Sequence, residues 1–181
     1  MRPVFLFSNM FKDYPNRKLN RIKGYDYSHD GFYFVTICVK NRANYFGRVM
    51  NQEMILNLFG KTVKNCWFDL PKHYGNCRLD ELIIMPNHLH GIVEINNHVG
   101  TDFKSVPTNK KYSLSTIIQG FKIFSSRRIN LLNPPILFRW HRSFYDHIIR
   151  DDESLYRIRK YIRENPLKWE FDRNKLENLY L

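Results

Sequence analysis

Two histidines separated by a single leucine are the clearest pair of metal-ligating side chains in this 181-residue chain. His88 and His90 open an apolar stretch that we predict to be a β-strand over residues 88–95. Residues i and i+2 of a strand project from one face, so both imidazoles can face one divalent cation while Leu89 packs on the opposite side. The pattern is common, and the alternative is one surface histidine beside a hydrogen-bonded core histidine. Glu94 has the same parity and is either a further ligand or an exposed carboxylate.

A tyrosine in the last long predicted helix has surroundings that suit attack on a phosphodiester. Tyr161 lies four residues after Arg157 and four residues before Asn165, so the three side chains share one helical face. A phenol with its ordinary pKa of about 10 is a weak nucleophile at neutral pH. A divalent cation on the phosphate oxygens makes the phosphorus more electrophilic and neutralises developing charge. The alternative is that Tyr161 is a half-buried packing residue whose hydroxyl is hydrogen-bonded.

Two other tyrosines compare less well with Tyr161 as nucleophiles. Tyr145 has a histidine two residues later, but we predict that this segment is a strand. We therefore interpret Tyr145 and His147 as core or DNA-contact residues. Tyr156 is on the same predicted helix as Tyr161, but a separation of five residues turns it away from that side chain.

The chain is strongly basic, with 29 lysines and arginines against 17 aspartates and glutamates and a net charge of +12. A polyanion is therefore the first partner to expect, although ribosome-associated and membrane-surface proteins are also basic. Tyr25, Tyr27 and Trp140 are candidate stacking surfaces for bases. The alternative is a solvated basic face. The cations that we predict to contact DNA phosphates are Arg17, Lys18, Arg21, Lys23, Lys122, Arg127, Arg128, Arg142, Arg150 and Arg157.

Composition excludes several classes of protein. An apolar fraction of 43% and an aromatic fraction of 15% exclude a disordered chain. No apolar run approaches the length of a transmembrane helix, and the run at 4–7 is too short for a signal peptide, so we expect a cytoplasmic, nucleoid-associated protein. Three cysteines without C-x-x-C spacing indicate a reducing compartment and core packing, and argue against a structural zinc site.

The order of predicted elements indicates an α+β fold. A basic arm over 1–30 precedes a single domain over 31–181. The pattern β-α-β-β-α-β followed by a helix is that of the ferredoxin-like split βαβ fold, an antiparallel sheet with both crossover helices on one face. We expect the terminal arms or a nucleic acid on the other face. The predicted strands are 31–39, 78–85, 88–95 and 138–149, with a short extended piece at 45–50, and the predicted helices are 53–69, 113–130 and 151–164.

Several motifs together resemble those of the Y1 transposases of the IS200/IS605 type, and in particular the REP-associated tyrosine transposases. They occur in the expected order and cover most of the chain. Each motif is unspecific by itself, but the joint pattern is specific. The motifs are Lys23-Gly-Tyr-Asp-Tyr27, Tyr33-Phe-Val-Thr-Ile-Cys38, Met85-Pro-Asn-His-Leu-His90, the segment 140–150 and Tyr161-Ile-Arg-Glu-Asn-Pro-Leu-Lys168.

The resemblance implies a nuclease that acts on single-stranded DNA with a hairpin. It implies that Tyr161, on the added C-terminal helix, attacks a DNA phosphate to give a 5′-phosphotyrosine link and a free 3′-OH. It also implies that His88 and His90 hold Mg²⁺ or Mn²⁺, with Asn165 as third ligand. Many relatives have glutamine at that position, and asparagine is shorter by one methylene. The implied assembly is a monomer or a homodimer.

Two alternatives to this enzyme remain open at the level of sequence. One is a catalytically inactive nucleic-acid binder on the same scaffold. The other is a nuclease of the rolling-circle or relaxase type, which uses the same chemistry but more often adds a third histidine near the pair or a second tyrosine. His98 is the candidate for that third histidine.

Overall fold

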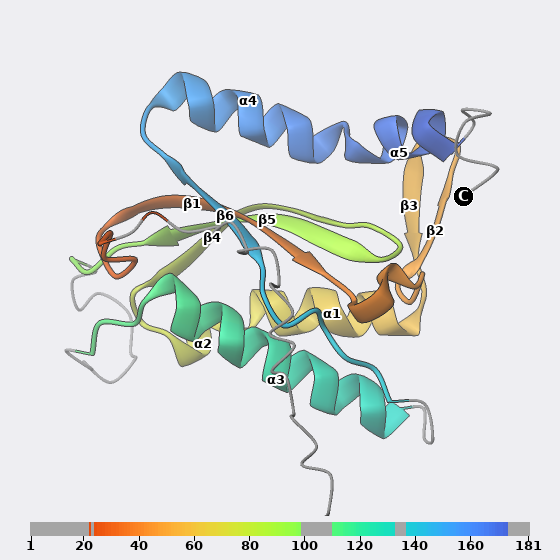
Figure 1. Cartoon of the computed structure of the whole chain (residues 1–181), viewed down its shortest axis with the longest axis horizontal. Coiled ribbons are helices and arrows are strands. Elements are labelled where there is room, and N and C mark those ends of the chain that lie inside the picture. The colour runs from red at the N-terminus through yellow and green to blue at the C-terminus, as the bar shows by residue number, and fades with distance from the viewer. Residues whose placement is uncertain (1–21, 23, 99–109, 133–136, 174–181) are drawn as a thin grey trace, which may run out of the picture.

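The structure, a computed structural model, describes residues 22, 24–98, 110–132 and 137–173, and side chains as far as 169 (Figure 1). No helix in these ranges is long and apolar enough to cross a membrane. The elements are, in chain order, β1 (Gly31–Cys38), the 3₁₀ turn η1 (Lys40–Arg42), β2 (Gly47–Met50), β3 (Glu53–Leu56), α1 (Leu58–Phe68), α2 (Leu70–His73), β4 (Cys77–Ile84), β5 (His88–Ile95), α3 (Leu114–Leu132), β6 (Tyr145–Ile149), α4 (Asp152–Arg163) and α5 (Asn165–Arg173).

Four strands form one antiparallel sheet in the order β4-β5-β1-β6. This is the strand order of the ferredoxin-like split βαβ fold, so the predicted fold class is confirmed. Strands β2 and β3 form a separate hairpin. The register of β4 against β5 shifts between Leu79 and Leu82, which marks a bulge in that edge strand.

One face of the sheet packs on α1 and α3, as predicted for the two crossover helices (Figure 1). Alternate residues of β1, among them Val35 and Ile37, are completely buried there. Trp67 of α1 lies so close to β5 that a Cβ atom on Gly91 would meet its ring at 2.5 Å. Glycine is therefore required at this position, because any side chain would push the helix away from the strand.

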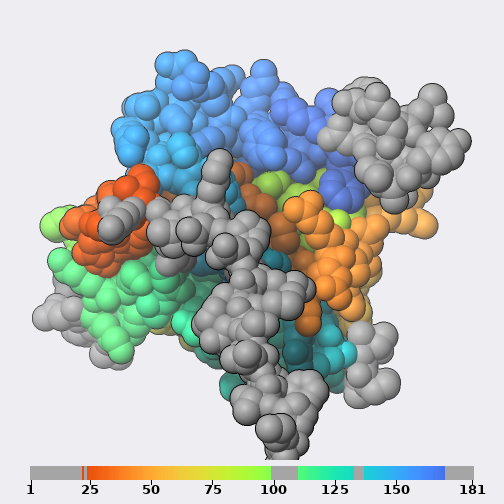
Figure 2. Space-filling model, viewed as in Figure 1, coloured from red at the N-terminus to blue at the C-terminus, as the bar shows by residue number. Residues whose placement is uncertain are grey.

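The other face is covered by α4, not by the terminal arms or a nucleic acid as expected. Phe34 and Ile92 of the sheet pack against Leu155 and Ile162 of the helix. Figure 2 shows the resulting layers, with α4 and α5 in blue above and α3 in green below. Asp151 begins α4 as predicted, because its carboxylate accepts a hydrogen bond from the Ser154 amide at 2.7 Å.

Three predicted boundaries are wrong. Residues 53–56 are strand β3 and not the start of a helix, because Asn51 and Gln52 both adopt positive φ and turn the chain back as a hairpin. Asn57 then starts α1, its side chain accepting a hydrogen bond from the Gly60 amide at 3.0 Å. In the predicted strand 138–149, only β6 pairs continuously, preceded by one bridge at Trp140. Asn165 begins α5 instead of lying on α4.

The end of the predicted arm belongs to the folded body. Residues 1–21 and 23 lie outside the described residues, but Tyr27 is buried in the core between the sheet and the crossover helices. Its carbonyl accepts a hydrogen bond from the Leu114 amide at 2.9 Å. Tyr25 packs edge-on against Tyr27. These two tyrosines therefore contribute to packing, and the prediction that they stack on bases is not supported.

Candidate active site

A tight turn between β4 and β5 presents the histidine pair. The Met85 amide donates to the His88 carbonyl at 2.8 Å, and the Pro86 carbonyl accepts hydrogen bonds from the amides of Tyr45 and Phe46. Leu89 is buried towards the crossover helices, so His88 and His90 point to the opposite face, under α4 and α5. Their Nε2 atoms lie 3.0 Å apart.

Hydrogen bonds on the far side of each ring orient the pair. The Asn87 amide group donates to the Arg42 carbonyl at 3.0 Å, which leaves its oxygen facing His88 Nδ1 at 2.7 Å. That oxygen only accepts, so His88 carries its proton on Nδ1 and directs a lone pair from Nε2. Thr36 Oγ1 lies 2.8 Å from His90 Nδ1 and can accept a hydrogen bond from it in the same way. Such partners fix the tautomer that binds metals.

Both imidazoles are neutral at pH 7. Burial lowers the pKa of His88 to about 4, with a smaller contribution from the positive charge of Arg42. Burial also lowers the pKa of His90 to about 3, helped by repulsion from His88. Neutral imidazole is the form that ligates metal ions, so no proton has to leave when a cation binds.

The spacing of the pair fits a hard divalent cation. Two nitrogens at about 2.1 Å from one octahedral ion and at right angles to each other are about 3.0 Å apart. The observed Nε2–Nε2 distance is 3.0 Å. No group of three or more His, Cys, Asp or Glu side chains that could hold a metal occurs in the described ranges. The remaining ligands of such an ion would have to be other side chains, water or substrate oxygens.

The phenol of Tyr161 lies beside the pair in the same chain. Its oxygen is 3.5 Å from His90 Nε2, and the two rings are 5.3 Å apart. Tyr161 is 37% exposed, and Phe34 packs against one edge of its ring. The ammonium of Lys168 lies 5.0 Å from the ring centre. The side chain is therefore held in place and still reachable from solvent.

Two ion pairs hold α4 against the edge strand β4. Arg159 contacts Asp80 with two hydrogen bonds, of 2.9 and 2.5 Å, and Arg163 contacts Glu81 at 2.8 Å. The hydrogen bond from Arg159 is the main cause of the lowered pKa of Asp80. Asp80 and Glu81 lie at the β4 bulge. These contacts flank Tyr161 in the sequence and set where the helix places it.

The start of α5 carries the predicted third ligand, Asn165, and an aromatic ring that contacts the pair. Asn165 is 7% exposed and begins α5. Because α4 ends at Arg163, Asn165 is not on the same helix as Tyr161. Trp169, one turn later, packs its ring 5.6 Å from that of His88. Trp169 was not among the predicted site residues. Its i, i+4 spacing from Asn165 is the sequence signal that would have found it.

Thr36 and Asn87 are two further residues that sequence reasoning missed. Asn87 immediately precedes the histidine pair, and Thr36 is a hydroxyl within the apolar strand β1. Each position is unremarkable by itself. The role of Thr36 follows from strand pairing, because it is the cross-strand partner of His90 in the β1–β5 register, and the role of Asn87 follows from its hydrogen bonds to Arg42 and His88.

The predicted DNA-binding cations have separate locations. Arg17, Lys18, Arg21 and Lys23 lie outside the described residues. Lys122 donates to the backbone carbonyls of residues 141–143 and so ties that segment to α3. Arg128 bonds Asp69 on the crossover-helix side, where Arg127 also lies, and Arg157 pairs with Glu153. Arg142 and Arg150 are exposed next to β6.

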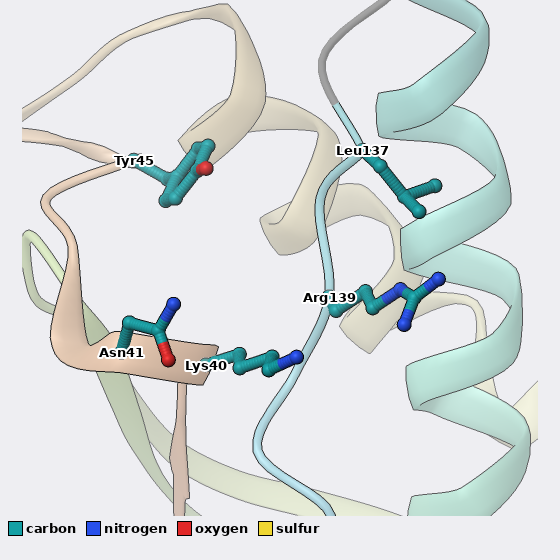
Figure 3. Close-up of a pocket in the computed structure, with 5 residues that line it drawn as sticks. All are labelled: Lys40, Asn41, Tyr45, Leu137 and Arg139. Atoms are coloured by element: carbon teal, nitrogen blue, oxygen red, sulfur yellow. The ribbon is translucent and has the colours of Figure 1, made fainter.

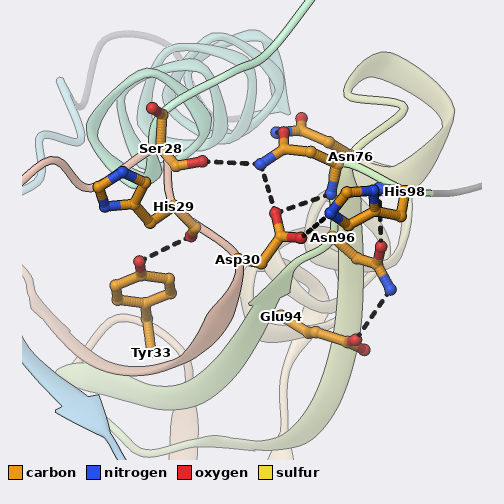
Figure 4. A network of polar contacts seen from close by, with 9 residues as sticks. Ser28, His29, Asp30, Tyr33, Asn76, Glu94, Asn96 and His98 are labelled. Atoms are coloured by element: carbon orange, nitrogen blue, oxygen red, sulfur yellow. Dashed lines mark hydrogen bonds and ion pairs between the residues drawn. The ribbon is translucent and has the colours of Figure 1, made fainter.

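Several other predicted residues have roles away from the pair. Trp140 is 7% exposed and its indole N–H donates to Ser125, so it is a core residue and not a stacking surface. Tyr145 and His147 are exposed, which excludes the core interpretation for both. Glu94 and His98 belong to a polar network around Asp30 beyond the other end of β5 (Figure 4). Neither is therefore a ligand beside the pair.

Comparisons with known proteins find one sequence relative and two similar solved structures. A protein of Haemophilus influenzae, described as uncharacterized, is 40% identical over 170 residues, which is 87% of this chain and 92% of the relative. A solved REP-associated tyrosine transposase bound to a REP hairpin matches with a TM-score of 0.56 and 17% identity, over 82% of this chain and 73% of that one. A candidate transposase of Deinococcus radiodurans matches with a TM-score of 0.46 and 18% identity, over 81% of this chain and 96% of that one.

The likeness to the hairpin-bound transposase shows a shared fold, and the match to a family model shows the family. The model of the family described as "Transposase IS200 like" matches residues 28–165, which includes both histidines and Tyr161. That range is most of the chain. This chain belongs to the IS200-like transposase family.

Proposed function

We propose that the protein is a metal-dependent transesterase that nicks single-stranded DNA and transfers the strand through Tyr161. The observation that carries the proposal is the 3.5 Å distance between the Tyr161 oxygen and Nε2 of His90, one of two neutral imidazoles that face each other. A phenol beside a paired-histidine cation site has the parts that phosphoryl transfer requires, namely a nucleophile and a site for charge neutralisation.

In the proposed reaction, the Tyr161 oxygen attacks a backbone phosphorus. The bond from phosphorus to the 3′ oxygen breaks, which leaves a 5′-phosphotyrosine link and a free 3′-OH. The phenolic proton passes to solvent, and the leaving 3′ oxygen takes one up. His88 and His90 would hold Mg²⁺ or Mn²⁺, with Asn165 as a further candidate ligand, and the bound ion would neutralise the charge that develops on the phosphate. A later attack by a 3′-OH on the phosphotyrosine would rejoin DNA.

The proposed substrate is a single strand that carries a hairpin. The support is the family membership together with the structural neighbour, a transposase bound to a REP hairpin. Acting on chromosomal DNA would place the protein at the nucleoid in the cytoplasm. Since Tyr161 and the histidines come from one chain, a monomer contains the complete set of residues, and a homodimer is not required.

The direct test is to detect the covalent adduct. A labelled hairpin oligonucleotide with single-stranded flanks is incubated with the protein and Mn²⁺ and run on a denaturing protein gel. The wild type should give a shifted, labelled band, and Tyr161→Phe should give none while still binding the DNA. Tyr156→Phe is the matched control, because Tyr156 lies on the same helix, is 63% exposed and has no assigned role. An adduct in Tyr161→Phe would refute the nucleophile, and a wild type that binds without an adduct would favour an inactive binder.

A further inference from the structure

A basic groove adjoins the candidate active site at the end of β1. It consists of two cavities of about 230 Å³ each, which share Asn41. Thr36 and Tyr145 are among the residues that line the inner cavity. The outer cavity is lined by Lys40, Tyr45, Leu137 and Arg139 besides Asn41 (Figure 3). Thr36 also bonds Nδ1 of His90, so the inner cavity is one side chain away from the histidine pair.

Strand register aligns the groove with the pair. Thr36 is paired with His90 in the β1–β5 register and with Tyr145 in the β1–β6 register. The three side chains therefore form one row across the face that α4 covers. With strands about 4.8 Å apart, Tyr145 lies about 10 Å from His90. Tyr145 is 49% exposed and its ring packs edge-on against Phe34, which also contacts Tyr161.

The walls of the groove are held in place by backbone hydrogen bonds. The Lys40 amide donates to the Arg139 carbonyl at 3.0 Å, and the His141 amide donates to the Cys38 carbonyl at 2.8 Å. On the far side, Lys122 donates to the carbonyls of residues 141–143 and turns them towards α3. The groove is therefore preformed.

The charge of the groove is uncompensated. Lys40, Arg42 and Arg139 line the two cavities and are exposed, and no acidic side chain is among the described residues that line either cavity. Lys40 and Arg139 lie side by side although like charges repel. Arg42 also holds a positive φ of 51°, a backbone conformation that residues with side chains rarely adopt. Exposed cations gathered in one groove attract an anionic ligand.

We propose that this groove holds the unpaired DNA segment next to the scissile phosphodiester. Backbone phosphates would lie against the cations of the two walls, and one base would stack on the exposed ring of Tyr145. The inference rests on the proposed function in one respect, because the proposed cleavage identifies the bound nucleotides as those next to the scissile phosphodiester. It assigns the single-stranded flank, and not the duplex stem of the hairpin, to this edge of the sheet.

The first test measures affinity by fluorescence anisotropy in the full-length chain. The probes are a labelled DNA hairpin with an unpaired arm and the same hairpin with a blunt end. Lys40→Ala/Arg139→Ala should weaken binding of the armed probe at least about fivefold and leave the blunt probe unchanged. The slope of log K against log salt should become shallower by about 1.4, for two phosphate contacts on a single strand.

The matched control is Lys61→Ala/Lys64→Ala, which removes the same charge from exposed positions on α1. Equal losses in the two double variants would reduce the effect to net charge and overturn the proposal. Equal losses on armed and blunt probes would move the contact to the stem and also overturn it. Tighter binding of an arm made of RNA than of one made of DNA would overturn the assignment of DNA as ligand.

Tyr145 gives a second, independent readout. Tyr145→Ala should weaken the armed probe about fivefold or more, because a stacked base contributes about 1–3 kcal/mol, whereas Tyr145→Phe keeps the ring and should bind as the wild type does. A phenylalanine variant as weak as the alanine variant would overturn the stacking role. These binding measurements do not depend on adduct formation. If the wild type forms an adduct but the groove variants bind normally, only the groove proposal fails. If the groove variants bind more weakly but the wild type forms no adduct, only the proposed chemistry fails.

Discussion

The two faces of the central sheet use the same strands for different purposes. On the face towards α1 and α3, the side chains of β1 are Tyr33, Val35 and Ile37, which are completely buried. On the face towards α4, Phe34 packs in an apolar cluster, and Thr36, two residues later, is hydrogen-bonded to His90. The odd-numbered residues of β1 therefore contribute to stability and the even-numbered residues to the candidate active site. Mutations should be able to change stability and activity separately.

The largest expected effect is a loss of stability on the face towards α1 and α3, which we call the structural face. Trp67→Ala would remove a fully buried indole packed on Gly91 and should lower the free energy of unfolding by about 3–5 kcal/mol, measured by urea denaturation. On the other face, Tyr161→Phe should change stability by less than about 0.5 kcal/mol while removing the adduct. If Tyr161→Phe is as destabilising as Trp67→Ala, the two faces do not divide the roles in this way.

The next effect concerns pH. The folded-state pKa values of His88 and His90, about 4 and about 3, are below the unfolded value near 6.5. Between these values the unfolded chain binds more protons, so acid favours unfolding. Without metal, stability should fall as pH drops from about 6.5 to about 4, by at most about 2.7 kcal/mol per pH unit for two groups. His88→Ala/His90→Ala should flatten this slope, and an unchanged slope would mean that the pair is not buried as described.

Metal addition sharpens the same comparison. Mn²⁺ at 100 times its dissociation constant should stabilise the wild type by about 2.7 kcal/mol, seen as a higher Tm. The His88→Ala/His90→Ala variant should show no such shift, and EDTA should abolish both the shift and the adduct. Trp67→Ala, on the structural face, should retain a shift. A wild type whose Tm ignores Mn²⁺ and Mg²⁺ would argue against the cation site.

The smallest expected effect tests how α4 is positioned. Asp80→Asn breaks the paired hydrogen bonds with Arg159 and should cost about 1 kcal/mol, because the ion pair is partly exposed. Asp80 has a lowered folded-state pKa, so the difference from wild type should disappear as pH falls through that lowered pKa. The rate of adduct formation should fall while hairpin affinity stays. Glu153→Gln, which removes the exposed partner of Arg157, should leave the adduct rate unchanged.

Local patterns predicted much of this architecture. The parity of His88 and His90 follows from the two-residue period of a strand, and the amphipathic spacing of α3 and α4 follows from the helical period. The first strand of the hairpin at 47–56 falls in the predicted extended piece, but the second was missed because Ile55, Leu58 and Phe59 mimic helical spacing. The decisive turn depends on positive φ at Asn51 and Gln52.

The rest depends on contacts between distant segments. Sequence places Tyr161 on a helix, but its approach to His90 depends on packing of α4 across the sheet and on the ion pairs to β4. Cations were selected by clustering, whereas their roles depend on partners. Lys122 and Arg128 are engaged by protein groups, while Lys40 and Arg139, which are far apart in the sequence, meet in one cavity.

The side chain of Asn87 connects two parts of the molecule that were described separately. Its amide nitrogen holds the backbone of Arg42 in the groove, and its oxygen fixes the proton of His88. A bound DNA strand that shifts the 40–42 turn therefore changes the orientation of the His88 imidazole. A cation bound by that imidazole likewise changes the position of the turn. Affinity for DNA and affinity for metal should then be thermodynamically linked, each raising or lowering the other by the same factor.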